Sequence, residues 1–402
     1  MTSATLPSLN LARLHRPFRG QLLCSLRAVI DRGEFILGPN VHELEKRIAR
    51  LTGARYAVAC GSGTDALQLA LRALGIGPGD AVITSSYSFF ATAEAISLVG
   101  ARPVFCDIEP QTFNIDVAQL AELLARDCRL QGRLLRHLAT GLVVKAIIPV
   151  HLFGRGADMA RLLPLARRYR LTVIEDAAQS LGARCRFGTG WRRAGSLGAL
   201  GCFSFYPTKS LGALGDGGMV VTSSRRLAER LLRLRSHGAR RKNWHTLIGL
   251  NSRLDELQAA ALLVKLHSLP ALIRRKRQLA DYYDRMLKGL FQLPDRSGPH
   301  PPTLSQYVVR CPQRDALHKF LLTRGIATEI YYPCPLHLQP CYRQLGYRRG
   351  DFPAAEDASR EALALPLDPL LTSREQHRVV AACREFLGLP EGRSRAKPSR
   401  CP

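Results

Sequence analysis

Short apolar runs alternate with helical patterns between residues 58 and 235. The runs at 58–60, 81–84, 102–107, 143–151, 173–176 and 217–222 are of strand length, and several precede segments with the apolar spacing of a helix. Strands that alternate with helices build parallel sheets covered by helices on both faces. The sequence therefore predicts an α/β domain around a mainly parallel sheet.

One lysine, Lys209, lies in an unusual setting for a charged side chain. It falls within the run GCFSFYPTKSLGALGDGG at 201–218, where aromatic and small residues precede it and glycines follow. Apolar neighbours desolvate an amine and favour its neutral, nucleophilic form. Such a lysine can form a Schiff base with pyridoxal 5′-phosphate, a cofactor that also needs a carboxylate at its ring nitrogen and donors around its phosphate. A solvated loop lysine is the alternative interpretation.

Two upstream segments supply candidates for those partners. Asp176 ends the apolar run 173–176, and ligands of open α/β sheets gather at the carboxyl ends of strands. The segment VACGSGT at 58–64 is a strand entering a glycine-rich turn before a helical pattern, and a helix N-terminus offers N–H groups to a phosphate. Alone, such an acid is as often a helix cap and such a turn is a weak signal. Their occurrence together with Lys209 favours a site for pyridoxal 5′-phosphate over these separate interpretations.

These segments, with EDAAQ at 175–179 and NSRLDELQAA at 251–260, closely resemble the DegT/DnrJ/EryC1/StrS family of pyridoxal-phosphate sugar aminotransferases. The resemblance runs from about Arg32 to about Leu387. It implies a fold-type I transferase of the aspartate aminotransferase-like class. In that class a large domain has a mainly parallel seven-stranded sheet between helices, a smaller C-terminal α+β domain follows, and a homodimer shares its active sites.

The resemblance assigns roles to individual residues. Lys209 is implied as the catalytic residue that carries the cofactor, and Asp176 as the partner of the ring nitrogen. Gln179, expected one helical turn after Asp176, is implied near the phenolic oxygen. Phe89 is implied to stack on the cofactor ring, with a core position as its alternative. The implied phosphate ligands are Gly63, Thr64, Ser204 and, reaching into the neighbouring subunit's site, Asn251.

Substrate contacts are implied in two places. The polar loop 239–245 is expected to cross to the neighbouring subunit, which makes His245 a candidate; a simple loop histidine is the alternative. Tyr332 and His337, in the motif YPCPLH at the predicted domain junction, are further candidates, with packing roles as their alternative. The chain departs from the family in having Leu181 where a histidine is common and Trp244 in a loop that is often rich in tyrosine.

The predicted organisation has a large cofactor-binding domain at 1–250, which includes an N-terminal entry segment, and a small α+β domain at 251–388. Within the small domain we expect a helical pattern from 254 to 287 that breaks near Pro270, strands at 306–309 and 327–331, and a helix at 315–324. The basic segment 126–142 is expected to be a surface elaboration. The tail at 389–402 is basic and contains proline, which predicts disorder.

Composition narrows the function classes. The net charge of +26 favours anionic ligands such as nucleotide sugars and glutamate, and it would permit nonspecific contact with nucleic acid or acidic membranes. Basic residues are scattered without a nucleic-acid motif, so we predict no specific nucleic-acid partner. The 11 cysteines stand singly, without a C-x-x-C pair, which predicts reduced thiols, no metal site and a cytoplasmic location. We find no apolar run long enough for a membrane span.

The predicted activity is a pyridoxal-phosphate-dependent transamination from L-glutamate to a keto sugar nucleotide. The run HTLIGLNSRLD at 245–255 most resembles members that aminate the sugar 3-position of a dTDP or UDP sugar, for surface polysaccharide, lipopolysaccharide or glycosylated metabolites. A 4-keto sugar is the alternative acceptor. A dehydratase of the same family would have histidine at Lys209, so the lysine argues against it. A noncatalytic regulatory or scaffold protein of this fold is the alternative of another class.

Overall fold

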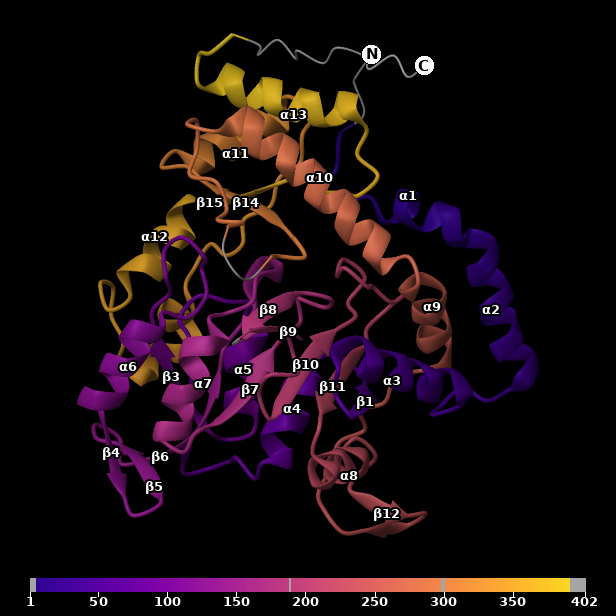
Figure 1. The fold of residues 1–402 in the computed structure, drawn as a ribbon, viewed down its shortest axis with the longest axis vertical. Helices are drawn as coiled ribbons and strands as arrows, with labels where there is room; N and C mark the ends of the chain where they lie inside the picture. The colour runs from indigo at the N-terminus through magenta and orange to yellow at the C-terminus, as the bar shows by residue number, and fades with distance from the viewer. Residues whose placement is uncertain (1–4, 188, 298–300, 391–402) are drawn as a thin grey trace.

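A computed structural model of the chain describes residues 5–187, 189–297 and 301–390 (Figure 1). Its larger part is built on one mixed sheet whose central path contains seven strands, as predicted. In spatial order these are β1 (Tyr56–Cys60), β11 (Gly218–Thr222), β10 (Leu200–Ser204), β7 (Thr172–Asp176), β6 (Val143–Ile148), β2 (Asp80–Ser85) and β3 (Arg102–Cys106).

The strands of this path are mainly parallel. From β10 through β7, β6 and β2 to β3 every neighbouring pair is parallel, whereas β11 is antiparallel to both β10 and β1. In the register of β10 and β7, Cys202 lies opposite Asp176. The carboxyl ends of β7 and β10 therefore meet at one edge of the sheet, which is where the resemblance places cofactor ligands.

Helices cover both faces, and the period-two alternation of each strand decides which residues meet them. Val58, Val82 and Val220 belong to a core cluster with α4 (Gly63–Ala73), α5 (Ala91–Leu98) and α8 (Arg225–Leu234). Ile83, one residue after Val82, packs instead in a cluster with α6 (Val117–Arg126) and α7 (Met159–Arg168). Ala59 and Phe203 join α3 (Pro39–Thr52) and α9 (Glu256–Leu266) in another cluster. The sheet is thus buried on both sides.

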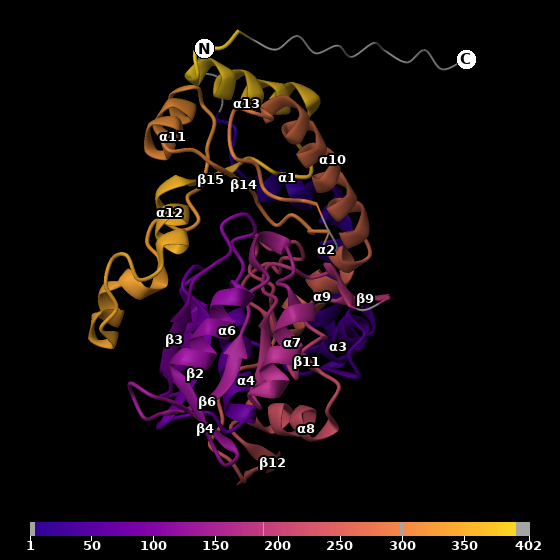
Figure 2. The same ribbon diagram turned by 60° about the vertical axis from the view of Figure 1, so that its left-hand side comes forward.

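A second core lies beside the sheet domain, at the top of Figures 1 and 2. Its helices are α10 (Leu269–Leu287), α11 (Arg314–Thr323) and α13 (Ser373–Phe386), around the antiparallel pair of β14 (Tyr307–Arg310) and β15 (Ala362–Leu365). Helix α12 (Pro353–Glu361) packs instead in a cluster with Tyr87 and Phe105 of the sheet domain. The N-terminal residue Leu6 joins this core through a bridge to Ile326. Helix α1 (Leu11–His15) and helix α2 (Arg19–Arg32) then lead towards α3. The division at 250 and 251 stays a prediction, and α9, beyond it, packs against α3 and the sheet.

Several local predictions can be compared with the structure. The helical break near Pro270 is confirmed, because α9 and α10 are bent by 60° at that point. The strand predicted at 327–331 is wrong: within it only Glu329 pairs, in an isolated bridge to Ala364 of β15, so the segment follows β15 without forming a continuous ladder. The segment 126–142 contains a hairpin of β4 (Cys128–Gln131) and β5 (Leu134–His137) that extends the sheet to nine strands along β6. Of the predicted disordered tail, 391–402 lie outside the described residues.

Two further hairpins project from the sheet domain. One pairs β8 (Arg184–Phe187) with β9 (Gly190–Arg193), and the other pairs β12 (Ala239–Arg241) with β13 (Trp244–His245), so the predicted polar loop contains a short ribbon. Among the described residues no single helix is long and apolar enough to cross a bilayer, although the bent pair α9 and α10 together meets that criterion.

Candidate active site

Asp176 and Lys209 lie close enough to influence each other's protonation. Asp176 is the last residue of β7 and is buried. Lys209 is half-buried in the turn after β10, where its backbone N–H donates to the Tyr206 carbonyl at 2.8 Å. Burial lowers the pKa of Lys209, and the charge of Asp176 opposes that change. Burial raises the pKa of Asp176, and donors and the positive charge of Lys209 oppose it. Lys209 therefore has the properties of a nucleophilic amine.

A chain of hydroxyl groups holds the Asp176 carboxylate. Thr92 Oγ1 on α5 donates to Asp176 Oδ2 at 2.7 Å and lies 2.9 Å from Ser88 Oγ. Because the single Thr92 proton is directed at Asp176, Ser88 donates to Thr92. The Ala178 N–H donates to the other carboxylate oxygen at 3.2 Å. Thr92 is not among the residues predicted from the sequence, where its one signal is its place one turn after the Phe89 junction.

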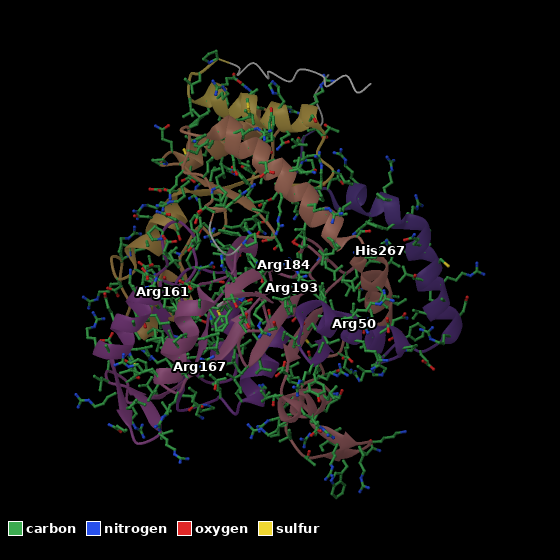
Figure 3. The ribbon with its side chains drawn as sticks, in the orientation of Figure 1. Arg50, Arg161, Arg167, Arg184, Arg193 and His267 are labelled. Carbon is green, nitrogen blue, oxygen red and sulfur yellow. The ribbon has the colours of Figure 1, made fainter. Side chains whose placement is uncertain are left out.

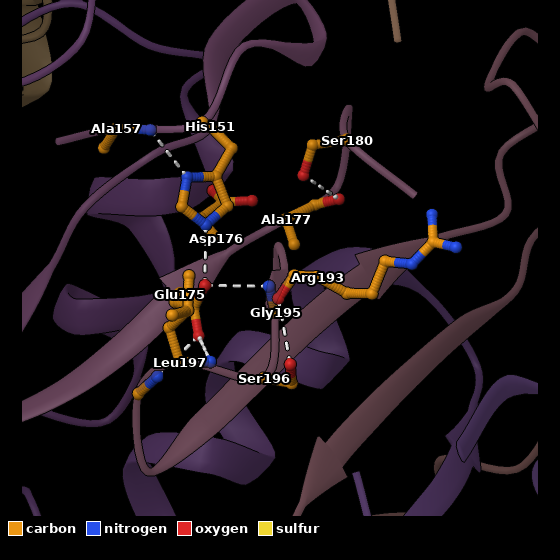
Figure 4. A network of polar contacts seen from close by, with 12 residues as sticks. His151, Ala157, Glu175, Asp176, Ala177, Ser180, Arg193, Gly195, Ser196 and Leu197 are labelled. Atoms are coloured by element: carbon orange, nitrogen blue, oxygen red, sulfur yellow. Dashed lines mark hydrogen bonds and ion pairs between the residues drawn. The ribbon is translucent and has the colours of Figure 1, made fainter. Parts of the chain in front are cut away.

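The neighbouring acid, Glu175, points to the other face of the sheet and has a structural partner set (Figure 4). Its carboxylate accepts from His151 Nε2 at 2.8 Å and from three backbone N–H groups at 2.6–2.7 Å, those of Gly195, Leu197 and Gly198. His151 Nδ1 accepts from the Ala157 N–H at 3.0 Å, so the ring proton is on Nε2. Both side chains are fully buried. This network holds the loop before β10 against the strand that carries Asp176.

The N-terminus of α4 and the end of β10 form a cradle. Ser62 caps the helix through the Asp65 N–H, and the N–H groups of Gly63 and Thr64 donate to no acceptor among the described residues. A Cβ atom at Gly63 would lie 2.6 Å from the Ser204 Cβ, so only glycine allows the two segments to approach this closely. Free N–H groups, a helix dipole and the Ser204 hydroxyl together suit a phosphate.

Gln179 follows Asp176 in a turn and not in the expected helix. Its side chain is buried, accepts from the Phe153 N–H at 2.8 Å and donates to the Tyr332 hydroxyl at 2.9 Å. The Tyr332 ring in turn lies 6.1 Å from the ring of Phe89, which is 56% exposed. The structure thus joins three predicted residues, and the exposed Phe89 contradicts the alternative of a core position.

Three predicted residues have no hydrogen bond to this cluster. Asn251 is exposed and forms an isolated β-bridge with Ser236. His245 is also exposed, and its Nδ1 lies 2.9 Å from the His237 carbonyl oxygen. His337 is buried, 3.1 Å from Glu356 and packed edge-on against Phe352, so the structure places it in a packing position. Among the residues that the structure describes, no group of three or more His, Cys, Asp and Glu side chains could hold a metal ion.

The cluster fits pyridoxal phosphate on observations of this structure. The cofactor's three requirements are met by a partly desolvated amine, a buried carboxylate with fixed donors, and a cradle of unpartnered N–H groups. Phe89 offers an exposed aromatic face beside them. The residues that would hold the cofactor are Lys209, Asp176, Gly63, Thr64, Ser204, Phe89 and Gln179.

Comparison with known proteins finds relatives that match nearly the whole chain. It is 43% identical over 384 residues to the "Pleiotropic regulatory protein" of Geobacillus stearothermophilus, covering 94% of this chain and 98% of that protein. It is 39% identical over 389 residues to "UDP-N-acetyl-3-dehydro-alpha-D-glucosamine 3-aminotranferase" of Acidithiobacillus ferrooxidans, covering 96% and 100% of the two chains. Both matches span nearly the whole of each protein.

Solved structures share the fold. DesV of S. venezuelae superposes with a TM-score of 0.88 at 39% identity, covering 96% of this chain and 99% of that one. NtdA of Bacillus subtilis, solved with bound cofactor PMP, superposes with a TM-score of 0.84 at 32% identity, covering 96% and 86%. The profile of the DegT/DnrJ/EryC1/StrS aminotransferase family matches residues 19–384. With the site geometry, these matches show that the chain belongs to the DegT/DnrJ/EryC1/StrS aminotransferase family.

Proposed function

We propose that this protein is a pyridoxal-phosphate-dependent aminotransferase that moves an amino group from L-glutamate to a keto sugar nucleotide. The observation that carries the proposal is the buried Asp176 carboxylate, held by Thr92 and coupled to the half-buried amine of Lys209. Relatives named as aminotransferases of nucleotide sugars support it. A relative solved with bound PMP supports the cofactor.

The residues of this chain divide the work. When bound, pyridoxal phosphate carries the amino group and takes up electron density from the adjacent carbon. Lys209 Nζ anchors the cofactor and, once freed, moves the proton at the amino-bearing carbon. Asp176 holds the proton at the ring nitrogen. Gly63, Thr64 and Ser204 orient the phosphate. The donor product leaves before the acceptor binds, so we expect ping-pong kinetics.

The acceptor in this proposal is a sugar nucleotide with a keto group at position 3. The relative from Acidithiobacillus ferrooxidans is named for a 3-dehydro sugar, and a Streptomyces venezuelae relative is named for a 3-amino sugar. The resemblance of residues 245–255 to 3-aminating members points the same way. A 4-keto sugar nucleotide is the alternative acceptor, and parallel assays of 3-keto and 4-keto substrates distinguish the two.

We also propose a homodimer in which each active site receives residues from both subunits. Asn251 and His245 are exposed and have no hydrogen bond to the Lys209 cluster of their own chain, as expected of residues that reach a neighbour. Mixing inactive Lys209→Ala chains with inactive Asn251→Ala chains tests this directly. Shared sites predict partial recovery of activity in the mixed dimers, whereas independent sites predict none.

The first test of the activity is the visible absorption of the purified protein with pyridoxal phosphate, before and after addition of glutamate. We expect a visible band that glutamate bleaches and that a keto sugar nucleotide restores. A protein that takes up no cofactor would contradict the proposal. A band that only a different amino acid bleaches would contradict the choice of glutamate alone.

A noncatalytic regulator is the second candidate, because the relative from Geobacillus stearothermophilus is named a regulatory protein. The complete set of Lys209, Asp176 and Ser204 argues against a protein without catalysis. Salt-sensitive DNA binding by cofactor-free protein, combined with no cofactor uptake, would favour the regulator.

A further inference from the structure

An open groove lined by basic and apolar residues lies between α3, β9 and the joint of α9 and α10, and it shares Leu269 with the small cavity that contains Lys209. Its volume is about 360 Å³, which is within the size range of small-ligand sites. Its basic side chains are Arg47, Arg50 and Arg193, and its floor is formed by Leu51, Leu266, Leu269 and Pro270. Guanidinium groups above an apolar floor suit a ligand that is anionic at one end and flat or apolar at the other.

The positive charge of this groove has few acidic partners. Arg47 pairs with Glu43 at 2.7 Å, whereas Arg50 and Arg193 form no ion pair with any of the described acids. Arg193 Nη1 donates to the Gly182 carbonyl at 3.0 Å, which leaves other guanidinium donors available. An anion could therefore pair with guanidinium groups that the fold itself leaves without a counter-charge.

Like charges are also crowded at the edge of the groove. Arg193 is directly opposite Arg184 in the register of β8 and β9, and like charges in that arrangement destabilise a hairpin. Burial lowers the pKa of Arg193, and the charge of Arg184 lowers it further. Figure 3 labels Arg184 and Arg193 next to each other near the centre of the view. A bound anion would relieve this repulsion.

The groove is connected to the active site through covalent and hydrogen-bonded steps. Arg193 ends β9, and two residues later the Gly195 N–H donates to Glu175 at 2.7 Å. Glu175 directly precedes Asp176 on β7. Two residues and one hydrogen bond therefore link Arg193 to the strand that carries Asp176.

We propose that this groove is a second binding site, beside the active site, for an organic phosphate of nucleotide size. The phosphate groups would pair with Arg50 and Arg193, and the base would lie on the apolar floor. The inference goes beyond the proposed transamination, because it concerns a site that holds none of the catalytic residues.

Tryptophan fluorescence can report binding near the groove, and variants of the groove and of a control position then distinguish this site from the active site. The chain has two tryptophans, Trp191 on β9 and Trp244 on β13, so Trp244→Phe leaves one reporter two residues from Arg193. In this background we expect a saturable change on addition of UDP. Arg50→Glu should weaken the apparent affinity about tenfold or more, as loss of a charge-assisted hydrogen bond does. Arg226→Glu on α8 is the matched control with the same change of net charge, and it should leave the affinity unchanged.

Five results would overturn the proposal. The first is no response of Trp191 to UDP, and the second is an equal loss of affinity in Arg226→Glu. The third is a response to a short single-stranded oligonucleotide but not to UDP, the fourth is a smaller species of Arg50→Glu in gel filtration, and the fifth is an unchanged affinity of Arg50→Glu for UDP. The second result would indicate a general charge effect and the third a polyanion surface. The fourth would indicate a contact between subunits. Cofactor absorption of the same variants reports the active site separately, so failure here leaves the proposed transamination untouched.

Discussion

The sharpest consequence of the site concerns Thr92, which holds Asp176 from α5. Thr92→Val removes the hydroxyl while keeping nearly the same shape, and the side chain is 1% exposed, so water cannot replace the lost donor. The hydrogen bond to Asp176 is 2.7 Å long, and bonds of this kind to a charged group contribute about 1.5–3 kcal/mol. We expect the charged form of Asp176 to lose this amount of stabilisation.

The loss should appear in cofactor affinity. If the ionised Asp176 pairs with the protonated ring nitrogen, a loss of about 1.5–3 kcal/mol raises the dissociation constant of pyridoxal phosphate roughly 10- to 150-fold. The sign of the pH dependence also follows. Burial already raises the pKa of Asp176, and loss of the Thr92 donor raises it further. As the pH is lowered, the variant therefore loses cofactor binding at a higher pH than the native protein does.

The assay is titration of cofactor-free protein with pyridoxal phosphate, followed by absorption at several pH values. Thr92→Ser is the matched control, because it keeps the hydroxyl and should bind nearly as tightly as the native protein. Equal affinity of native protein and Thr92→Val, with the same pH profile, would refute the view that Asp176 acts as a charged partner held by Thr92.

Other predictions follow from single contacts. Lys209→Ala should abolish covalent cofactor uptake and transamination without changing the far-ultraviolet circular dichroism, and retained turnover would disprove its role. Glu175→Gln should lower the free energy of unfolding by about 2–4 kcal/mol in urea, because an amide cannot accept from all four buried donors; native stability would contradict the network in Figure 4. Gly63→Ala should weaken cofactor binding in the same titration, because its Cβ would meet Ser204 at 2.6 Å, whereas Gly20→Ala, with open space around it, should not. Equal affinity of the two glycine variants would argue against the cradle.

Much of the fold could be predicted because strand and helix periodicity is local. The six apolar runs of the first domain all became strands of one sheet, and the break at Pro270 follows from proline chemistry alone. The strand expected at 327–331 failed for a nonlocal reason. Its pattern is compatible with pairing, but beside β15 it forms only the single bridge of Glu329 to Ala364. The extent of such pairing depends on how two distant segments lie beside each other, which neither segment determines alone.

The site, like the fold, has features that are local in the sequence and features that depend on distant contacts. The sequence by itself determined the chemical groups, because Lys209, Asp176 and the glycine-rich turn before α4 are recognisable from residue type and order. Only the tertiary structure decided which partners tune them. Thr92 reaches Asp176 across 84 residues, and Gln179 reaches Tyr332 across 153. It also separated Glu175 from Asp176, since adjacent residues of a strand point to opposite faces, and so gave one acid to the loop before β10 and the other to the amine of Lys209.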